Sequence, residues 1–119
     1  MVDFNKAVIA HGKWKDRLQD FANGTGGSLD PDVVGRDDRG EFGTWLHGDG
    51  ATAKNMPSYA AVVSSHATFH RHAAEIVRRI KAGNIEEVKG MLADPNSAYA
   101  RTSRDVILTM SRLKREVEG

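Results

Sequence analysis

The sequence predicts an all-α fold, an antiparallel four-helix bundle with additional short helices. Three long stretches carry apolar residues at every third or fourth position, which is the spacing of one face of a helix. No stretch alternates between apolar and polar residues as a half-buried strand does, and short or glycine-rich connections separate the helical stretches. Amphipathic helices joined in this way bury their apolar faces against one another, which favours a bundle.

Size and charge limit the class of protein further. A single domain over residues 1–119 is expected, because one hydrophobic core is natural at this length. The net charge of +1 does not supply the concentrated positive surface that nucleic acid requires. The chain contains no cysteine. Disulfides, thiolate metal ligands and cysteine nucleophiles are therefore excluded. No stretch is suited to a membrane span or a secretion signal, so we expect a cytoplasmic protein.

The first long helix is expected over residues 4–21. Asp3 is placed to cap its N-terminus, and three glycines among residues 23–28 end it. A loop is expected from there to about Asp37. The inward face of this helix consists of Phe4, Val8, His11, Trp14, Leu18 and Phe21.

A short helix is expected next, roughly from Arg39 to His47. Asp38 lies three residues before Glu41, the spacing of a capping box, so Asp38 is the expected cap. The residues after His47 should end this helix and lead into a flexible segment that reaches Met56. The apolar residues of the short helix are Phe42, Trp45 and Leu46.

The second long helix is expected to begin at Pro57, whose missing N–H costs nothing in a first turn, and to end at Gly83. Asn84 is the expected cap of another short helix, and a final long helix follows Asp94 and Pro95. The inward face of the second long helix consists of Tyr59, Val62, Val63, His66, Phe69, His70, Ala73, Ile76, Val77 and Ile80. The final helix carries Tyr99, Ser103, Val106, Met110, Leu113 and Val117 on its inward face.

Three of the five histidines are expected to face the interior of the bundle. His66 and His70 are four residues apart on one helix face, so their side chains can chelate one metal ion. His11 lies on the inward face of the first helix. Zinc is the expected metal for such imidazole ligands, although nickel, copper and iron accept the same donors. The alternative is that each histidine fills a core position and bonds to a backbone carbonyl.

The other two histidines are not expected to join this group. His72 follows His70 by two residues, which places it on the opposite side of the helix, toward solvent. His47 closes the short helix, where an interaction with the C-terminal carbonyls is the preferred interpretation.

Three motifs resemble the chemoreceptor zinc-binding domain family. They are His11-x-x-Trp14, then Gly40-x-Phe42-Gly43-x-Trp45-Leu46, then His66-x-x-x-His70, in the family's order and over most of the chain. The resemblance implies a four-helix bundle that holds zinc through three histidines and one cysteine. It implies that His11, His66 and His70 are zinc ligands, and that the glycine and tryptophans of the motifs have structural roles.

The chain departs from the family at Gly40, which stands in the place of the cysteine ligand. The fourth position on a metal would therefore hold water or a carboxylate, and water is the preferred expectation. A glycine cannot be oxidised as a thiolate can, so oxidant sensing through that position is not expected. The nearby candidates for a protein ligand are Asp37, Asp38, Glu41 and His47.

The resemblance implies a zinc-binding regulatory module of bacterial signal transduction, associated with a chemoreceptor or a diguanylate cyclase, and not an enzyme. Its expected partners are a signalling domain or protein, fused or separate, and a second copy of the chain. The alternative, favoured by Gly40, is a metal-free helical module for interaction or dimerisation. A hydrolytic zinc enzyme ranks below both, because no carboxylate is placed as an obvious general base.

Overall fold

The computed structural model describes residues 2–25 and 27–119, and within these ranges every regular element is a helix. The all-α prediction is therefore confirmed. No helix among the described residues combines the length and hydropathy needed to cross a membrane. The elements are α1 (Phe4–Gly12), α2 (Trp14–Ala22), α3 (Pro31–Val34), α4 (Gly40–His47), the 3-10 helix η1 (Asp49–Ala53), α5 (Tyr59–Lys81), α6 (Ile85–Ala93) and α7 (Ala98–Glu118).

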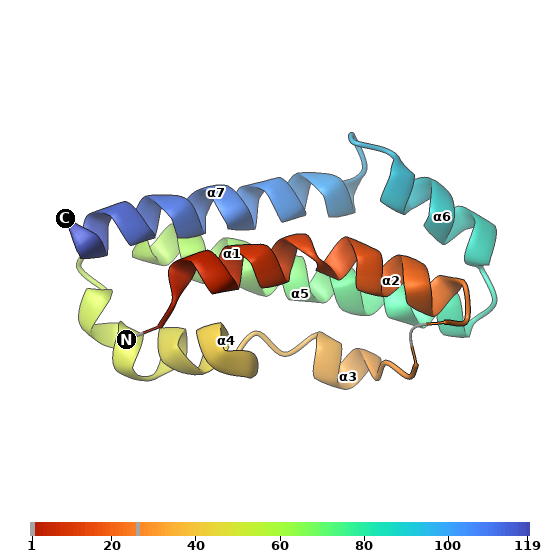
Figure 1. The fold of residues 1–119 in the computed structure, drawn as a ribbon, viewed down its shortest axis with the longest axis horizontal. Helices are drawn as coiled ribbons and strands as arrows, with labels where there is room; N and C mark the ends of the chain where they lie inside the picture. The colour runs from red at the N-terminus through yellow and green to blue at the C-terminus, as the bar shows by residue number, and fades with distance from the viewer. Residues whose placement is uncertain (1, 26) are drawn as a thin grey trace.

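The helices run alternately along the long axis of the molecule (Figure 1). α1 and α2 run in one direction, α3 and α4 return, α5 runs forward again, and α7 returns beside it. The central helix is α5, which contacts α7, α3, α2 and α6. The core between these helices is apolar, and its fully enclosed side chains include Leu18, Leu46, Phe69, Val106 and Met110.

Side-chain caps explain where several helices begin. Asp3 accepts a hydrogen bond of 3.1 Å from the backbone N–H of Lys6, as the sequence predicted. Asp30 and Ser97 cap α3 and α7 in the same way. Because each cap satisfies an N–H group that has no partner inside its helix, these positions define the helix starts.

The first long helix is divided in two. It was predicted as one helix over residues 4–21, whereas α1 ends at Gly12 and α2 begins at Trp14. The interruption is slight, because the backbone N–H of Lys13 still donates to the carbonyl of Ile9 at 3.0 Å. Glycine is a poor helix former, which places the weak point at Gly12.

Two segments predicted as loop or flexible chain contain short helices. The loop expected to reach Asp37 includes α3, because Asp30 caps the segment and Pro31 occupies its first turn. Val34 of α3 is buried in the core. The flexible segment expected after α4 includes η1. Both corrections concern elements of four or five residues, which are too short to show hydrophobic periodicity.

Three predicted helix starts also need correction. Asp38 does not cap α4; its carboxylate accepts two hydrogen bonds from the Arg36 guanidinium, at 2.9 and 2.8 Å. The two bonds from the guanidinium occupy both carboxylate oxygens, and Arg39 takes the N-cap position of α4. α5 begins at Tyr59, two residues after Pro57. Asn84 does occupy the N-cap position of α6, but its side chain makes no capping hydrogen bond.

Gly43 allows α4 to pack directly on the chain that precedes it. A Cβ atom at this position would lie 2.3 Å from the carbonyl oxygen of Asp37. Since no side chain fits at that distance, the close approach requires glycine. This contact fixes α4 beside the histidines described next.

Candidate metal centre

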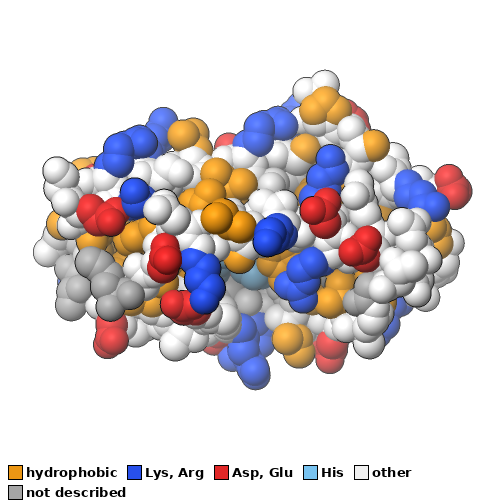
Figure 2. Space-filling model, viewed as in Figure 1, with side chains coloured by type: hydrophobic (Ala, Val, Ile, Leu, Met, Phe, Trp, Pro, Cys, Tyr) orange, Lys and Arg blue, Asp and Glu red, His pale blue; other side chains and the backbone are white. Residues whose placement is uncertain are grey.

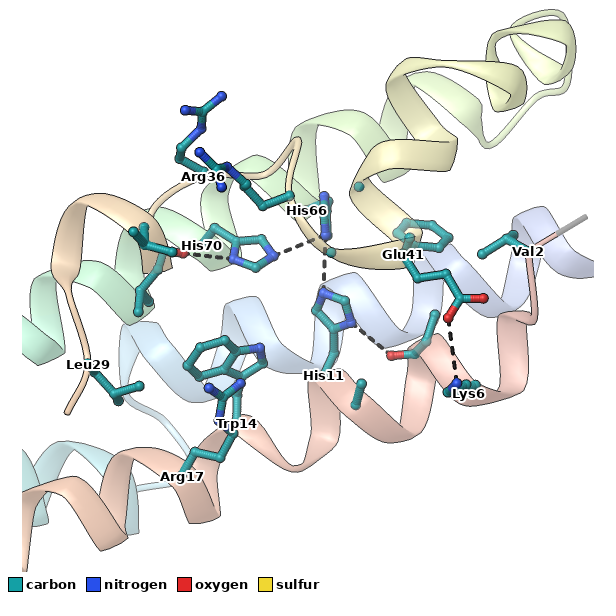
Figure 3. Close-up of a pocket in the computed structure, with 18 of the residues that line it drawn as sticks. Val2, Lys6, His11, Trp14, Arg17, Leu29, Arg36, Glu41, His66 and His70 are labelled. Atoms are coloured by element: carbon teal, nitrogen blue, oxygen red, sulfur yellow. Dashed lines mark hydrogen bonds and ion pairs between the residues drawn. The ribbon is translucent and has the colours of Figure 1, made fainter. Parts of the chain in front are cut away.

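His11, His66 and His70 lie together where α1 meets α5 (Figure 3). One ring nitrogen from each histidine lies within 4.8 Å of the other two. The side chains are nearly enclosed, with 6%, 1% and 7% of each residue exposed, respectively. The structure thus brings together the three histidines that the sequence predicted to face inward. His72 is half-buried and lies outside the group.

The Nε2 atoms of the three rings converge. His66 Nε2 lies 3.1 Å from His11 Nε2 and 3.1 Å from His70 Nε2. The opposite nitrogens of the two outer rings face carbonyl oxygens: His11 Nδ1 donates to Ala7 at 2.8 Å, and His70 Nδ1 donates to Val34 at 2.9 Å. A carbonyl oxygen only accepts, so both Nδ1 atoms carry the proton.

This proton placement leaves lone pairs facing one another. In their neutral forms His11 and His70 have no proton on Nε2, so both atoms are acceptors. His66 cannot satisfy both fully with one N–H, and its own Nδ1 is buried without a hydrogen-bond partner. A cation at the point of convergence would satisfy all three Nε2 lone pairs, which is the arrangement of metal-ligating histidines.

Burial keeps these rings neutral. It lowers the pKa of His11 from 6.5 to about 4, against the opposing hydrogen bond to Ala7. Burial lowers the pKa of His66 to about 2, and charge repulsion from His70 and His11 adds to the effect. Burial also lowers the pKa of His70, although its hydrogen bond to Val34 opposes the shift. A neutral imidazole is the form that binds a metal ion.

The spacing of the rings fits a zinc ion. Zinc–nitrogen bonds of about 2.0–2.1 Å in a tetrahedral site place the ligand atoms about 3.3 Å apart. The two measured Nε2 distances of 3.1 Å need only a small outward movement to meet that value. The donor set also suits nickel, copper and iron.

Aromatic rings enclose the histidines. Phe42 of α4 lies 5.3 Å from the His66 ring, and Phe69 of α5 lies 5.4 Å from the His11 ring, measured between centroids. Trp14 of α2 is 6.3 Å from the His70 ring. These apolar walls restrict the rotamers of the three rings and exclude water from one side of the group.

The four predicted candidates for a fourth protein ligand make other contacts. Two of them, Asp37 and His47, bind each other at 3.3 Å. Asp38 is paired with Arg36, and Glu41 is paired with Lys6 at 3.6 Å. His47 was expected to interact with the carbonyls of its own helix, and it binds Asp37 because that carboxylate lies within reach. Gly40 has a φ of +75°, and a Cβ built on it would meet no atom within 4 Å.

A cavity of about 550 Å³ opens beside the histidines. All three rings line it, together with residues of α1, α2, α3 and α4. Figure 2 shows a histidine at the bottom of a hollow in this face, with basic and hydrophobic side chains around the opening. The histidine group is therefore open toward solvent through this cavity.

The two carbonyls that orient the outer rings were not predicted from the sequence. Ala7 lies four residues before His11 on the same helix, so helical spacing alone could have indicated that contact. Val34 is 36 residues from His70 in the chain. Its contact depends on how α3 packs against α5, for which the sequence carries no direct signal.

The fold and this group define an all-helical protein with a candidate metal centre of three buried histidines. The family model described as the chemoreceptor zinc-binding domain matches residues 11–77, which is more than half of the chain. The chain therefore belongs to the chemoreceptor zinc-binding domain family. The matched range begins at His11 and contains His66 and His70. Neither the search of curated proteins nor the search of solved structures found a match.

Proposed function

We propose that the chain is a zinc-binding regulatory module of bacterial signal transduction. In this proposal His11, His66 and His70 hold the metal, and water or a carboxylate takes the fourth position. The supporting observation is the convergence of three Nε2 atoms, two of them left unprotonated by carbonyl bonds on the opposite nitrogen. Membership of a zinc-binding family supports the choice of metal.

The proposal includes the architecture that such a module needs. We infer one sensory domain over residues 1–119, located in the cytoplasm, with the alternating helices of Figure 1 forming an antiparallel four-helix bundle. α3 and α4 together take the place of one helix of that bundle. Zinc would join α1 to α5, and so metal binding would favour one packing of these helices over another.

The partners in this proposal are a signalling domain or protein, fused to the chain or separate, and a second copy of the chain. The family description places related domains in chemoreceptors, which supports the first partner. We assign the module a regulatory and not a catalytic role. With Gly40 in place of the cysteine, zinc itself or a ligand of the metal is the stimulus, because no thiolate is present for an oxidant to attack.

Elemental analysis of the protein, purified without an affinity tag or chelator, tests the metal site. About one equivalent of zinc is expected in the native chain and little in His70→Ala, because two imidazoles retain zinc weakly. His72→Ala is the matched control, since this histidine lies on the same helix outside the group, and should keep its zinc. Equal zinc in all three proteins would contradict the site.

A metal-free module for interaction or dimerisation is the second candidate, and Gly40 is the observation that favours it. The chain then has no strong anionic ligand, and the three rings would have to be satisfied by one another, by backbone carbonyls or by buried water. Absence of metal after incubation with zinc, with unchanged stability of the fold, would favour this candidate over the first.

A further inference from the structure

We propose that the cavity beside the histidines binds a small organic carboxylate, whose oxygen replaces water as the fourth ligand of the metal. The inference rests on the proposed three-histidine site. It assigns that site a ligand class and makes the domain a receptor for a metabolite-sized anion in addition to a metal site. Three features of the cavity carry it: the missing negative charge, the apolar walls, and the arginines at the rim.

The metal site lacks a compensating negative charge. Three neutral imidazoles leave the full charge of a divalent cation in a nearly enclosed place, where a charge is costly unless it is paired. No carboxylate among the described residues belongs to the group. Asp37, whose charge acts on His70, is bonded to His47, and Asp38 and Glu41 are paired with Arg36 and Lys6. An anion from solution should therefore bind this metal site more tightly than it would bind a site that already has a thiolate ligand.

The shape and walls of the cavity suit an organic molecule with an apolar body. Its volume of about 550 Å³ lies within the range of small-molecule sites. Trp14, Leu29, Val34 and Phe42 line it, whereas the three histidines provide the polar end. Figure 3 shows Trp14 and Leu29 on one side of the opening that leads to His11 and His70. A carboxylate at the metal would leave its hydrocarbon chain against these walls.

Arginines surround the opening. Arg17, Arg36 and Arg39 line the cavity. Arg36 is paired with Asp38, and Arg17 lies over the Trp14 ring at 3.9 Å. Arg39 forms no ion pair with any described residue, although its charge acts on Asp38. It therefore adds positive charge at the opening, which favours the entry of an anion.

Acidic side chains also line the cavity, but each has a local function. Asp3 and Asp30 cap α1 and α3. Glu41 is paired with Lys6. These hydrogen bonds leave the charges of Asp3 and Asp30 in place, so the four basic and three acidic side chains that line the cavity give it a net charge of +1.

The experiment uses cobalt in place of zinc, because the visible spectrum of cobalt reports a change of ligand. The full chain is loaded with cobalt and its metal content is measured, and the protein is then titrated with acetate, butyrate and hexanoate. We expect a saturable spectral shift, and affinity should rise about fourfold for each added methylene that enters the apolar part of the cavity. Butanamide and hexanamide, which lack the charge, should cause no shift.

Two variants locate the binding. Arg39→Gln should weaken hexanoate binding about threefold, because it removes one positive charge from the opening of the cavity. Arg112→Gln is the matched control, because Arg112 is exposed on α7, which contributes no residue to the cavity. This variant should bind hexanoate with the affinity of the native chain.

The outcomes separate this inference from the proposed function. If cobalt binds in one equivalent and the spectrum is unchanged by every carboxylate, the carboxylate receptor is wrong and the metal site stands. A shift that is independent of chain length and equal in both arginine variants places the anion outside the cavity and also overturns the inference. If the native chain binds no metal, the proposed function fails and the inference fails with it.

Discussion

His70 donates its Nδ1–H to the carbonyl oxygen of Val34 at 2.9 Å, and this bond joins α5 to the short helix α3. A metal bound at His70 Nε2 withdraws electron density from the ring and makes Nδ1–H a stronger donor. Metal binding at the proposed site would therefore be coupled to the packing of α3, the element that also lines the cavity.

Zinc is expected to protect the backbone of α3 from hydrogen exchange. The amides of Val34 and Gly35, which bond to the carbonyls of Asp30 and Pro31, should exchange several-fold more slowly in the zinc-loaded chain than in the metal-free chain. Mass-spectrometric exchange can follow them, with the turn at Ser97 as a remote reference. Equal protection at the reference turn would indicate a global effect instead of this local coupling.

The metal-free chain should lose stability as the pH falls below 6.5. Unfolded histidines take up protons near that pH, whereas His11 and His66 remain neutral in the fold down to about pH 4 and about pH 2. The unfolded state therefore binds more protons, and each such histidine lowers the free energy of unfolding by about 1.4 kcal/mol per pH unit. Both contributions are fully present above pH 6.5; that of His11 is lost between pH 6.5 and about pH 4, and that of His66 continues to fall toward about pH 2.

Urea unfolding at pH 7, 6 and 5 in the presence of a chelator measures this dependence. His66→Phe, which keeps an aromatic ring but cannot titrate, should show a shallower slope than the native chain. His72→Gln lies outside the buried group and should retain the native slope. A native slope of zero over this range would contradict the burial of neutral rings.

Tyr99→Phe should stabilise the fold. The Tyr99 hydroxyl is buried without a hydrogen-bond partner, and only 2% of the residue is exposed. Burial also raises the pKa of Tyr99 beyond its usual range, so the hydroxyl stays protonated at all ordinary pH values. Removing an unsatisfied buried hydroxyl should raise the free energy of unfolding by about 1 kcal/mol, measured by urea denaturation. A loss of stability would show that the hydroxyl is bonded in solution.

Glu116 holds the start of α5 against the end of α7. Its carboxylate accepts hydrogen bonds from the backbone N–H of Ser58 at 2.8 Å and from the Ser58 hydroxyl at 2.5 Å. Glu116→Ala should lower the free energy of unfolding by about 1–2 kcal/mol. Glu118→Ala is the control, because its pair with Lys114 is exposed and should contribute only a few tenths of a kcal/mol. Equal losses in thermal or urea unfolding would count against the Ser58 contact.

Gly43→Ala should be strongly destabilising. The added Cβ would lie 2.3 Å from the carbonyl oxygen of Asp37, so the backbone must move to admit it. We expect a loss of at least about 2 kcal/mol, within the range of overpacked sites. Gly90 in α6 has open space around it, so Gly90→Ala should raise the free energy of unfolding by about 1 kcal/mol through its better helix propensity. Urea unfolding compares the two variants directly. Similar effects at both glycines would refute the close approach.

The sequence alone determined the long helical stretches and the inward direction of the three histidines. Apolar spacing predicted the long helices and the buried faces on which His11, His66 and His70 lie, because helical periodicity is a local property of the chain. The Asp3 cap followed from the same local rules. The motifs at these histidines also indicated the family to which the chain belongs.

Tertiary structure decided how those histidines are used. The 3.1 Å approach of the Nε2 atoms, the Val34 carbonyl on His70 and the cavity beside the rings all depend on the packing of α1, α3 and α5. Each of these groups could bond to many partners with similar energy. Only the packed chain shows which partner lies within bonding distance.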